Sequence, residues 1–234
     1  MYIETFTFNS KTLLSVDFDR EQTCIYRCPW CYCNNMENIY PKWKEKIYRN
    51  ALKAKETPKQ FADKLNLEYN YLINSKQKKL RRLSKIPIRI YGSGDYISEH
   101  FDFLTNLRFP HFIISKNLTT KKYINEIEKL DKYDKNLTSI VLSYYINNID
   151  NYIIKNNLKI QNTRIKLSFT GNSEEYYKVI NKGFKFDIFF NTLRTKQGIE
   201  QSRKIKEQCP CDSKLIEHNE SCTYCNKCWK PNLN

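Results

Sequence analysis

The feature that most constrains the fold is an alternation of short β-branched and aromatic runs with segments of helical spacing, which dominates the chain from residue 86 onward. With an earlier apolar run, six strands are predicted, at 13–18, 86–91, 112–115, 139–144, 164–169 and 184–190. Five helices are predicted behind the later strands, at 98–106, 121–130, 149–156, 173–181 and 199–206. Strands that alternate with helices form parallel crossover units. We therefore expect an α/β fold, a partial (β/α)6 TIM-like barrel with parallel strands rather than the full eight units.

A helical insertion at about 44–82 is predicted between the first two strands, interrupted near Thr57 and Pro58, which suit an N-cap and a first helical residue. The polar segment 35–43 is predicted to be irregular. The basic run 76–82 is interpreted as a solvated helix end that complements the helix dipole, and a phosphate contact is the alternative.

The predicted domains are a barrel at 1–206, with the helical insertion, and a cysteine-rich metal-binding segment at 207–234.

The chain has 234 residues and nine cysteines, most of them in two tight groups. Such grouping indicates metal ligation in a reducing compartment rather than a disulfide framework. No secretory signal and no apolar run of about 18 residues is visible, so a soluble, cytoplasmic protein without membrane contact is expected. The net charge of +15 favours a polyanionic partner, with a nucleic acid or nucleotide first, although the lysines are spread along the chain.

The first cysteine group follows the first predicted strand. Cys24, Cys28 and Cys31 stand at C-x3-C-x2-C spacing, with Trp30 before the last cysteine and Cys33 shortly after it. Three thiolates on one loop can ligate a single iron–sulfur cluster, and three ligands leave one iron of a four-iron cluster open. Structural zinc is the alternative, with Cys33 as a fourth ligand; otherwise Cys33 is a spare thiol.

This loop resembles the signature loop of the radical S-adenosylmethionine (SAM) enzymes. The resemblance implies a [4Fe-4S] cluster on Cys24, Cys28 and Cys31 whose open iron binds SAM, with Trp30 against the adenine. It also implies an external electron donor and reductive cleavage of SAM to a 5′-deoxyadenosyl radical. The substrate stays unknown, and no catalytic residue can be singled out.

Loops after the later strands are expected at the same edge of the sheet as the cysteines, because carboxyl ends of parallel strands meet there. The segment Gly92-Ser93-Gly94-Asp95 resembles the Gly-Gly-Glu-like segment with which radical SAM enzymes bind the SAM amino group. The alternative is a turn that caps the next helix. Ser115 and Lys116 suit the SAM carboxylate or ribose, and Ser143 the ribose; a solvated strand end is the alternative.

The tail holds a second possible metal site. Cys222, Cys225 and Cys228 at C-x2-C-x2-C spacing, with Cys209, supply four thiolates, and Cys211 is a possible substitute. Such a set binds either an auxiliary [4Fe-4S] cluster, which we favour, or zinc. Metal binding would help to fold a tail with little apolar content.

The tail, the Ser-Gly-Asp segment and the run 112–116 together resemble the phage gene-product-88-like family, which is related to radical SAM proteins. The resemblance supports fold and cofactor but supplies no substrate. The predicted function is therefore a radical SAM enzyme; the alternative is a non-catalytic zinc protein that binds nucleic acid. His100, His111 and His218 are interpreted as structural or surface residues.

Overall fold

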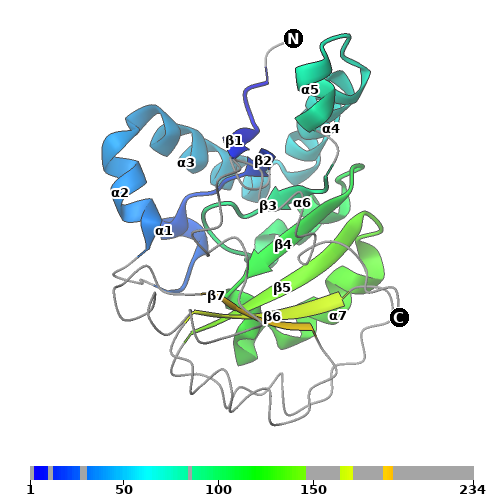
Figure 1. Ribbon diagram of the computed structural model, residues 1–234. Coiled ribbons are helices and arrows are strands. Elements are labelled where there is room, and N and C mark those ends of the chain that lie inside the picture. Colours follow the sequence, from blue (N-terminus) through cyan, green and yellow to red (C-terminus); the bar gives the residue numbers. More distant parts are fainter. Residues whose placement is uncertain are drawn as a thin grey trace.

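The fold is known from a computed structural model that describes residues 3–9, 13–26, 31–83, 86–145, 164–170 and 187–191. Seven strands in these segments form one sheet in the order β1-β2-β3-β4-β5-β6-β7 (Figure 1). The strands are β1 (Thr7–Asn9), β2 (Leu13–Val16), β3 (Ile88–Ile90), β4 (His111–Ser115), β5 (Leu137–Tyr145), β6 (Arg164–Thr170) and β7 (Asp187–Asn191). Each strand from β2 to β7 runs parallel to the next, whereas β1 pairs with β2 in the antiparallel direction.

The predicted α/β class is confirmed, and the sheet is mixed, mostly parallel and open, with β1 and β7 at its two edges. The six strands predicted from the sequence correspond to β2 through β7. The sequence analysis missed β1, which has only three residues, Thr-Phe-Asn, and no clear alternation. The predicted helices at 149–156, 173–181 and 199–206 and the segment 207–234 lie outside the described residues.

Long helices connect β2 to β3. The helices of the described segments are α1 (Arg20–Thr23), α2 (Tyr32–Ile39), α3 (Pro41–Glu56), α4 (Pro58–Asn74), α5 (Lys78–Leu83), α6 (Phe101–Thr105) and α7 (Ile124–Tyr133), with short 3-10 turns η1 (Ser98–His100), η2 (Asn117–Thr119) and η3 (Lys121–Tyr123). The predicted irregular segment 35–43 was wrong, because α2 and the start of α3 cover it. Pro41 begins α3 instead of breaking a helix, since the first helical position needs no N–H donor.

The interruption between α3 and α4 is confirmed, with Pro58 at the first position of α4. Thr57 is the residue between the two helices, but its side chain makes no capping bond to α4. Its hydroxyl instead donates to the carbonyl oxygen of Lys53, at 3.2 Å, within the end of α3. The helix α4 ends at Asn74, so the basic run 76–82 lies beyond it and forms most of a separate helix, α5.

The core lies between the sheet and a layer of helices in which α3 contacts α4, α4 contacts α6 and α6 contacts α7 (Figure 1). Phe18, two residues beyond the end of β2, packs edge-on against Phe61 of α4 and Phe103 of α6, with ring centroids 6.5 and 5.7 Å away. All three rings are buried, and full burial of such a side chain contributes about 1.5–3 kcal/mol. The core therefore extends to the point where the chain turns toward the cysteines.

A buried ion pair lies at the amino ends of the strands, beside the first residue of β4. His111 Nε2 is 2.8 Å from Asp134 Oδ2, and His111 Nδ1 is 3.0 Å from the carbonyl oxygen of Phe109. Burial disfavours the charged ring, but the Asp134 carboxylate outweighs it and raises the pKa of His111. His111 and His100 are both buried, as expected of structural residues, and His218 lies outside the described residues.

No helix in the described segments has the length and apolar composition needed to cross a membrane.

Candidate functional site

A short helix separates β2 from the first cysteine. Asp19 caps α1 by accepting a hydrogen bond from the backbone N–H of Glu21 at 3.0 Å, and α1 ends at Thr23, next to Cys24. The thiol of Cys24 donates to the carbonyl oxygen of Tyr26 at 3.3 Å. The cysteine segment therefore begins one helical turn beyond the carboxyl end of β2, on the edge of the sheet that the sequence predicted.

Cys31 is the N-cap residue directly before α2, and Cys33 is buried two positions later. The Cys33 thiol, by hydrogen bonding to the Cys31 sulfur, is the largest cause that lowers the pKa of Cys31 to about 5. Burial opposes this shift, whereas the Cys33 backbone N–H and the charges of Arg20 and Lys116 reinforce it. Arg20 is itself held by an ion pair to Glu37, Nε to Oε1 at 3.2 Å. The surroundings of Cys31 thus favour a thiolate, the form in which cysteine binds metals.

The two glycines after β3 are explained by close contacts within the protein. A Cβ on Gly92 would lie 1.9 Å from Asp17 Oδ1, and Gly94 has φ +73°, in the region that favours glycine. Between them, the backbone N–H of Ser93 donates to Asp17 Oδ1 at 3.1 Å, and Trp43 Nε1 donates to Asp17 Oδ2 at 3.2 Å. Asp17 therefore ties the loop after β3 to the end of β2 and to α3.

Asp95 joins the loops after β3 and β4. Its Oδ1 accepts the Ser115 hydroxyl and the backbone N–H of Tyr96, and its Oδ2 accepts the backbone N–H groups of Lys116 and Asn117 at 2.9 and 3.2 Å. The carboxyl is buried, and burial raises its pKa to about 6 despite these donors. Asp95 thus caps η2, the turn after β4, rather than the helix that follows it in the chain.

Asn117 completes the connection to the cysteine segment, and the sequence analysis did not identify it. Its Nδ2 donates to the carbonyl oxygens of Thr23 and Tyr96, both at 2.7 Å, and its Oδ1 accepts the backbone N–H of Ile25 at 3.2 Å. Thr23 Oγ1 in turn accepts the backbone N–H of Asp95 at 3.0 Å. We call Thr23, Asp95, Ser115 and Asn117 the edge network, because they fasten the loops after β2, β3 and β4 to one another.

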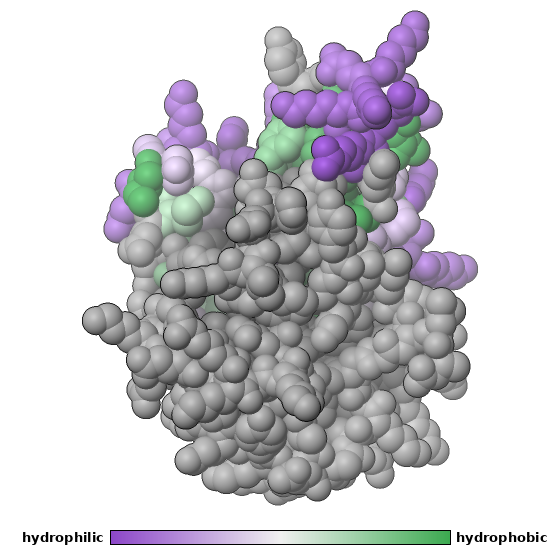
Figure 2. Space-filling view, viewed as in Figure 1, coloured by the Kyte–Doolittle hydropathy of each residue, from purple (hydrophilic) through white to green (hydrophobic). Residues whose placement is uncertain are grey.

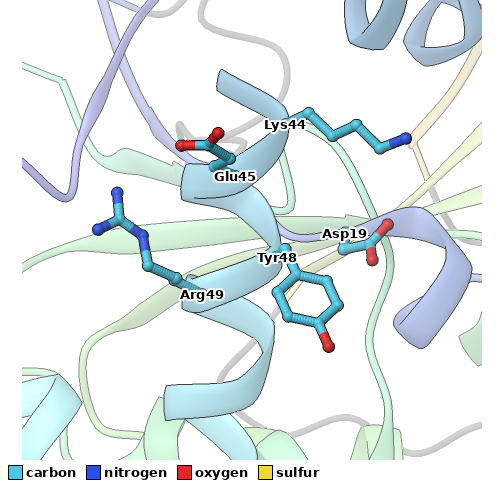
Figure 3. A pocket seen from close by; sticks show the side chains of 5 residues that line it. All are labelled: Asp19, Lys44, Glu45, Tyr48 and Arg49. Atoms are coloured by element: carbon cyan, nitrogen blue, oxygen red, sulfur yellow. The ribbon is translucent and has the colours of Figure 1, made fainter. Parts of the chain in front are cut away.

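An open cleft of about 370 Å³ lies beside this edge, between α3 and the residue that caps α1. It is lined by Asp19, Lys44, Glu45, Tyr48 and Arg49. Figure 3 shows Lys44 and Tyr48 extending from α3 on the side of Asp19, with Glu45 and Arg49 on the other side of the helix. Two cations and two carboxylates balance in charge, and Asp19 is already engaged with α1, so the lining does not define one ligand.

Part of the predicted cofactor site can be compared with the structure. Ser115 and Asp95 are in contact, Lys116 lies near enough to Cys31 to affect its pKa, and Ser143 is buried near the end of β5. Cys28, Trp30 and the tail cysteines, Cys209, Cys211, Cys222, Cys225 and Cys228, lie outside the described residues. Within the described segments, no three His, Cys, Asp or Glu side chains are grouped so that they could hold a metal ion. A three-cysteine site would need Cys28.

Sequence reasoning also missed Asp17 and Arg20. Both could have been found from their positions. Asp17 is an acid at the carboxyl end of a strand, and Arg20 is a cation beside the cysteine loop; functional residues of parallel α/β folds gather at that end of the strands. Comparisons of the chain with protein-family models, with curated proteins and with solved structures found no match.

Proposed function

We propose that this protein is a radical SAM enzyme whose cluster is held by Cys24, Cys28 and Cys31. The observation that carries the proposal is the edge network. It fastens the segment that starts the cysteine motif to the loops after β3 and β4, which hold the Gly-Ser-Gly-Asp and Ser-Lys segments. Ligand sites in parallel α/β folds are built from such loops at the carboxyl edge of the sheet.

The chemistry of the described donors fits a cluster. Cys31 has a thiol that ionises readily, and Cys24 is partly exposed on the same segment. Cys33 is buried and hydrogen-bonds to Cys31, so we assign it to tuning that thiolate rather than to a fourth ligand. When bound, a four-iron cluster supplies the electron that cleaves SAM into methionine and a 5′-deoxyadenosyl radical. The protein's part is to bind, orient and shield the reactants.

The residues proposed for SAM divide into two groups. The side chains of Asp95 and Ser115 hydrogen-bond to each other, and Asp95 also accepts backbone N–H groups at the start of η2. We therefore assign both residues to positioning the loops. The segment Gly92–Gly94 is proposed to contribute backbone groups. Lys116 is proposed to meet the SAM carboxylate, which its charge suits. Ser143 is proposed as a ribose contact, and Trp30 as the neighbour of the adenine.

The remainder of the proposal concerns the rest of the chain. We propose that the parallel sheet is part of a (β/α)6 partial barrel at 1–206 and that α3, α4 and α5 form an insertion. The cysteines of 207–234 are proposed to hold an auxiliary [4Fe-4S] cluster, with zinc as the alternative, and an external donor is proposed to supply electrons.

The test is anaerobic reconstitution with iron and sulfide, followed by SAM and dithionite. The wild type should bind four irons at the first site and form 5′-deoxyadenosine, whereas Cys24→Ala, Cys28→Ala and Cys31→Ala should lose both. Cys33→Ala is the matched control, because it removes a cysteine from the same segment and should keep the iron. Zinc in place of iron, with no SAM cleavage, would refute the proposal and favour a zinc protein that binds nucleic acid. Iron loss in Cys33→Ala equal to that in Cys31→Ala would refute the ligand assignment.

A further inference from the structure

Positive charge is concentrated on α5 and on Lys76, two residues before it, away from the candidate site. The stretch 69–94 contains no aspartate or glutamate. Five cations within it are exposed, and we call them the α5 basic face: Lys76, Lys78, Lys79, Arg81 and Arg82. Because α5 leads into β3, this face lies toward the amino ends of the strands, opposite the edge with the cysteines (Figure 1).

The apolar residues of α5 are turned inward. Leu83 is buried in the core, and Leu80 is partly buried against it. What α5 presents to solvent is therefore cationic, and Figure 2 shows hydrophilic side chains gathered over this end of the molecule. A helix that enters a membrane interface keeps an exposed apolar face beside its charges. The packing of Leu80 and Leu83 leaves α5 without such a face.

The lysines of the α5 basic face lack acidic partners among the described residues. Within the described segments, no ion pair is found for Lys76, Lys78 or Lys79. Lys78 and Arg82 are four residues apart and Lys79 and Arg82 three apart, spacings at which like charges on a helix repel. A role in balancing the dipole of α4 does not apply, because α4 ends at Asn74 and has no basic residue in its last turn.

We propose that the α5 basic face binds the phosphate backbone of a nucleic acid. The run 76–82 covers roughly 10 Å if it rises as a helix does. A DNA duplex carries one phosphate charge per ~1.7 Å of axis, so about six phosphate charges lie along the same length. Both strands together carry these charges, so α5 faces only part of them, and Lys76, Lys78 and Lys79 can each contact one phosphate on that side. Lysine and arginine contacts of this kind carry no base information, so binding is expected without sequence preference. The inference goes beyond the proposed enzymatic function and does not depend on a bound cluster.

The test is fluorescence anisotropy of a labelled DNA duplex of about 20 base pairs, titrated with the full chain over a range of salt concentrations. Three phosphate contacts give a slope of log K against log salt of about −2.7, so doubling the salt should weaken binding about 6-fold. Lys78→Gln/Lys79→Gln should flatten the slope by about 2 and weaken binding at least ~10-fold at about 100 mM salt.

The matched control is Lys122→Gln/Lys132→Gln, which removes two exposed charges from the η3–α7 segment, far from α5 in Figure 1. It should bind within about two-fold of the wild type, and far-ultraviolet circular dichroism should show all three proteins folded. Equal losses in both double variants, or no binding by the wild type at low salt, would overturn the proposal. Binding to anionic phosphatidylserine vesicles but not to DNA would assign the α5 basic face to a membrane instead.

Discussion

Asn117→Asp tests whether the edge network holds the candidate site together. The substitution keeps the shape of the side chain but replaces Nδ2, a donor to the carbonyl oxygens of Thr23 and Tyr96, with an oxygen. Asn117 is fully buried, so neither carbonyl can turn to water without moving a loop. Because no atom is deleted, a change in stability reports on hydrogen bonding and charge rather than on a cavity.

The magnitude follows from the contacts. Two buried hydrogen bonds at 2.7 Å are lost, each worth about 0.5–1.5 kcal/mol. The new carboxyl also faces two carbonyl oxygens in the interior, close to Asp95, and burial of an acid adds a further cost when it ionises. A total loss of about 3 kcal/mol in the free energy of unfolding is expected, which corresponds to a fall in Tm of about 6–12 °C for a chain of this size.

Thermal unfolding followed by circular dichroism measures this loss, with Asn70→Asp as control. Asn70 is exposed on α4, so that variant should melt within about 1–2 °C of the wild type. The new carboxyl's pKa is expected to be raised by burial, so the stability that its protonation provides is lost as the pH rises through that pKa. Asn117→Asp should therefore be least destabilised near pH ~4 and most near pH ~7. Equal melting of both variants at pH ~7 would refute the role of Asn117.

Two further substitutions test other parts of the structure. Gly92→Ala should destabilise the protein by about 1–3 kcal/mol, because its Cβ would lie 1.9 Å from Asp17 Oδ1; unfolding in urea measures it, and an unchanged midpoint would contradict the close contact. His111→Gln removes a group whose pKa is raised by Asp134, so the stability it provides is present below pH 6.5 and is lost as the pH rises through the pKa of the folded state. The difference in Tm between wild type and His111→Gln should shrink from pH ~6 to ~9; a difference that widens would contradict the ion pair.

The strands β2 to β5 could be predicted from the sequence because they contain apolar and β-branched residues that are buried in the sheet. Thus Phe112 and Ile113 in β4 and Ile140 and Val141 in β5 are all fully buried. The break before Pro58 was equally visible, since proline is favoured at the first position of a helix. By contrast, α2 lies in a polar segment without a cap signal, and it forms beside the cysteine segment where Arg20 pairs with its Glu37.

The site could be predicted in part. Its position at the carboxyl ends of the strands followed from topology, and the segments Gly92–Asp95 and Ser115–Lys116 are joined there as neighbours. The hydrogen-bond partner of each side chain could not be predicted from the sequence. Asp95 reaches across to η2, and Asn117 reaches back 94 residues to Thr23, because these loops meet only after the sheet has formed. A sequence read in order contains no local sign of such contacts.

The edge therefore contains two kinds of residue with separable effects. Asp17, Asp95 and Asn117 are buried and engaged with the backbone of neighbouring loops, so changing them should alter stability first and any chemistry only through the loops they hold. Cys24 and Cys31 are partly exposed, so replacing either should have little effect on folding of the sheet, whereas it should abolish binding of the proposed cluster. If the cysteine segment needed a metal in order to fold, replacing a cysteine would lower stability as well. The edge network argues against a metal requirement for folding, because Thr23 and Ile25 are both hydrogen-bonded to Asn117 within the protein.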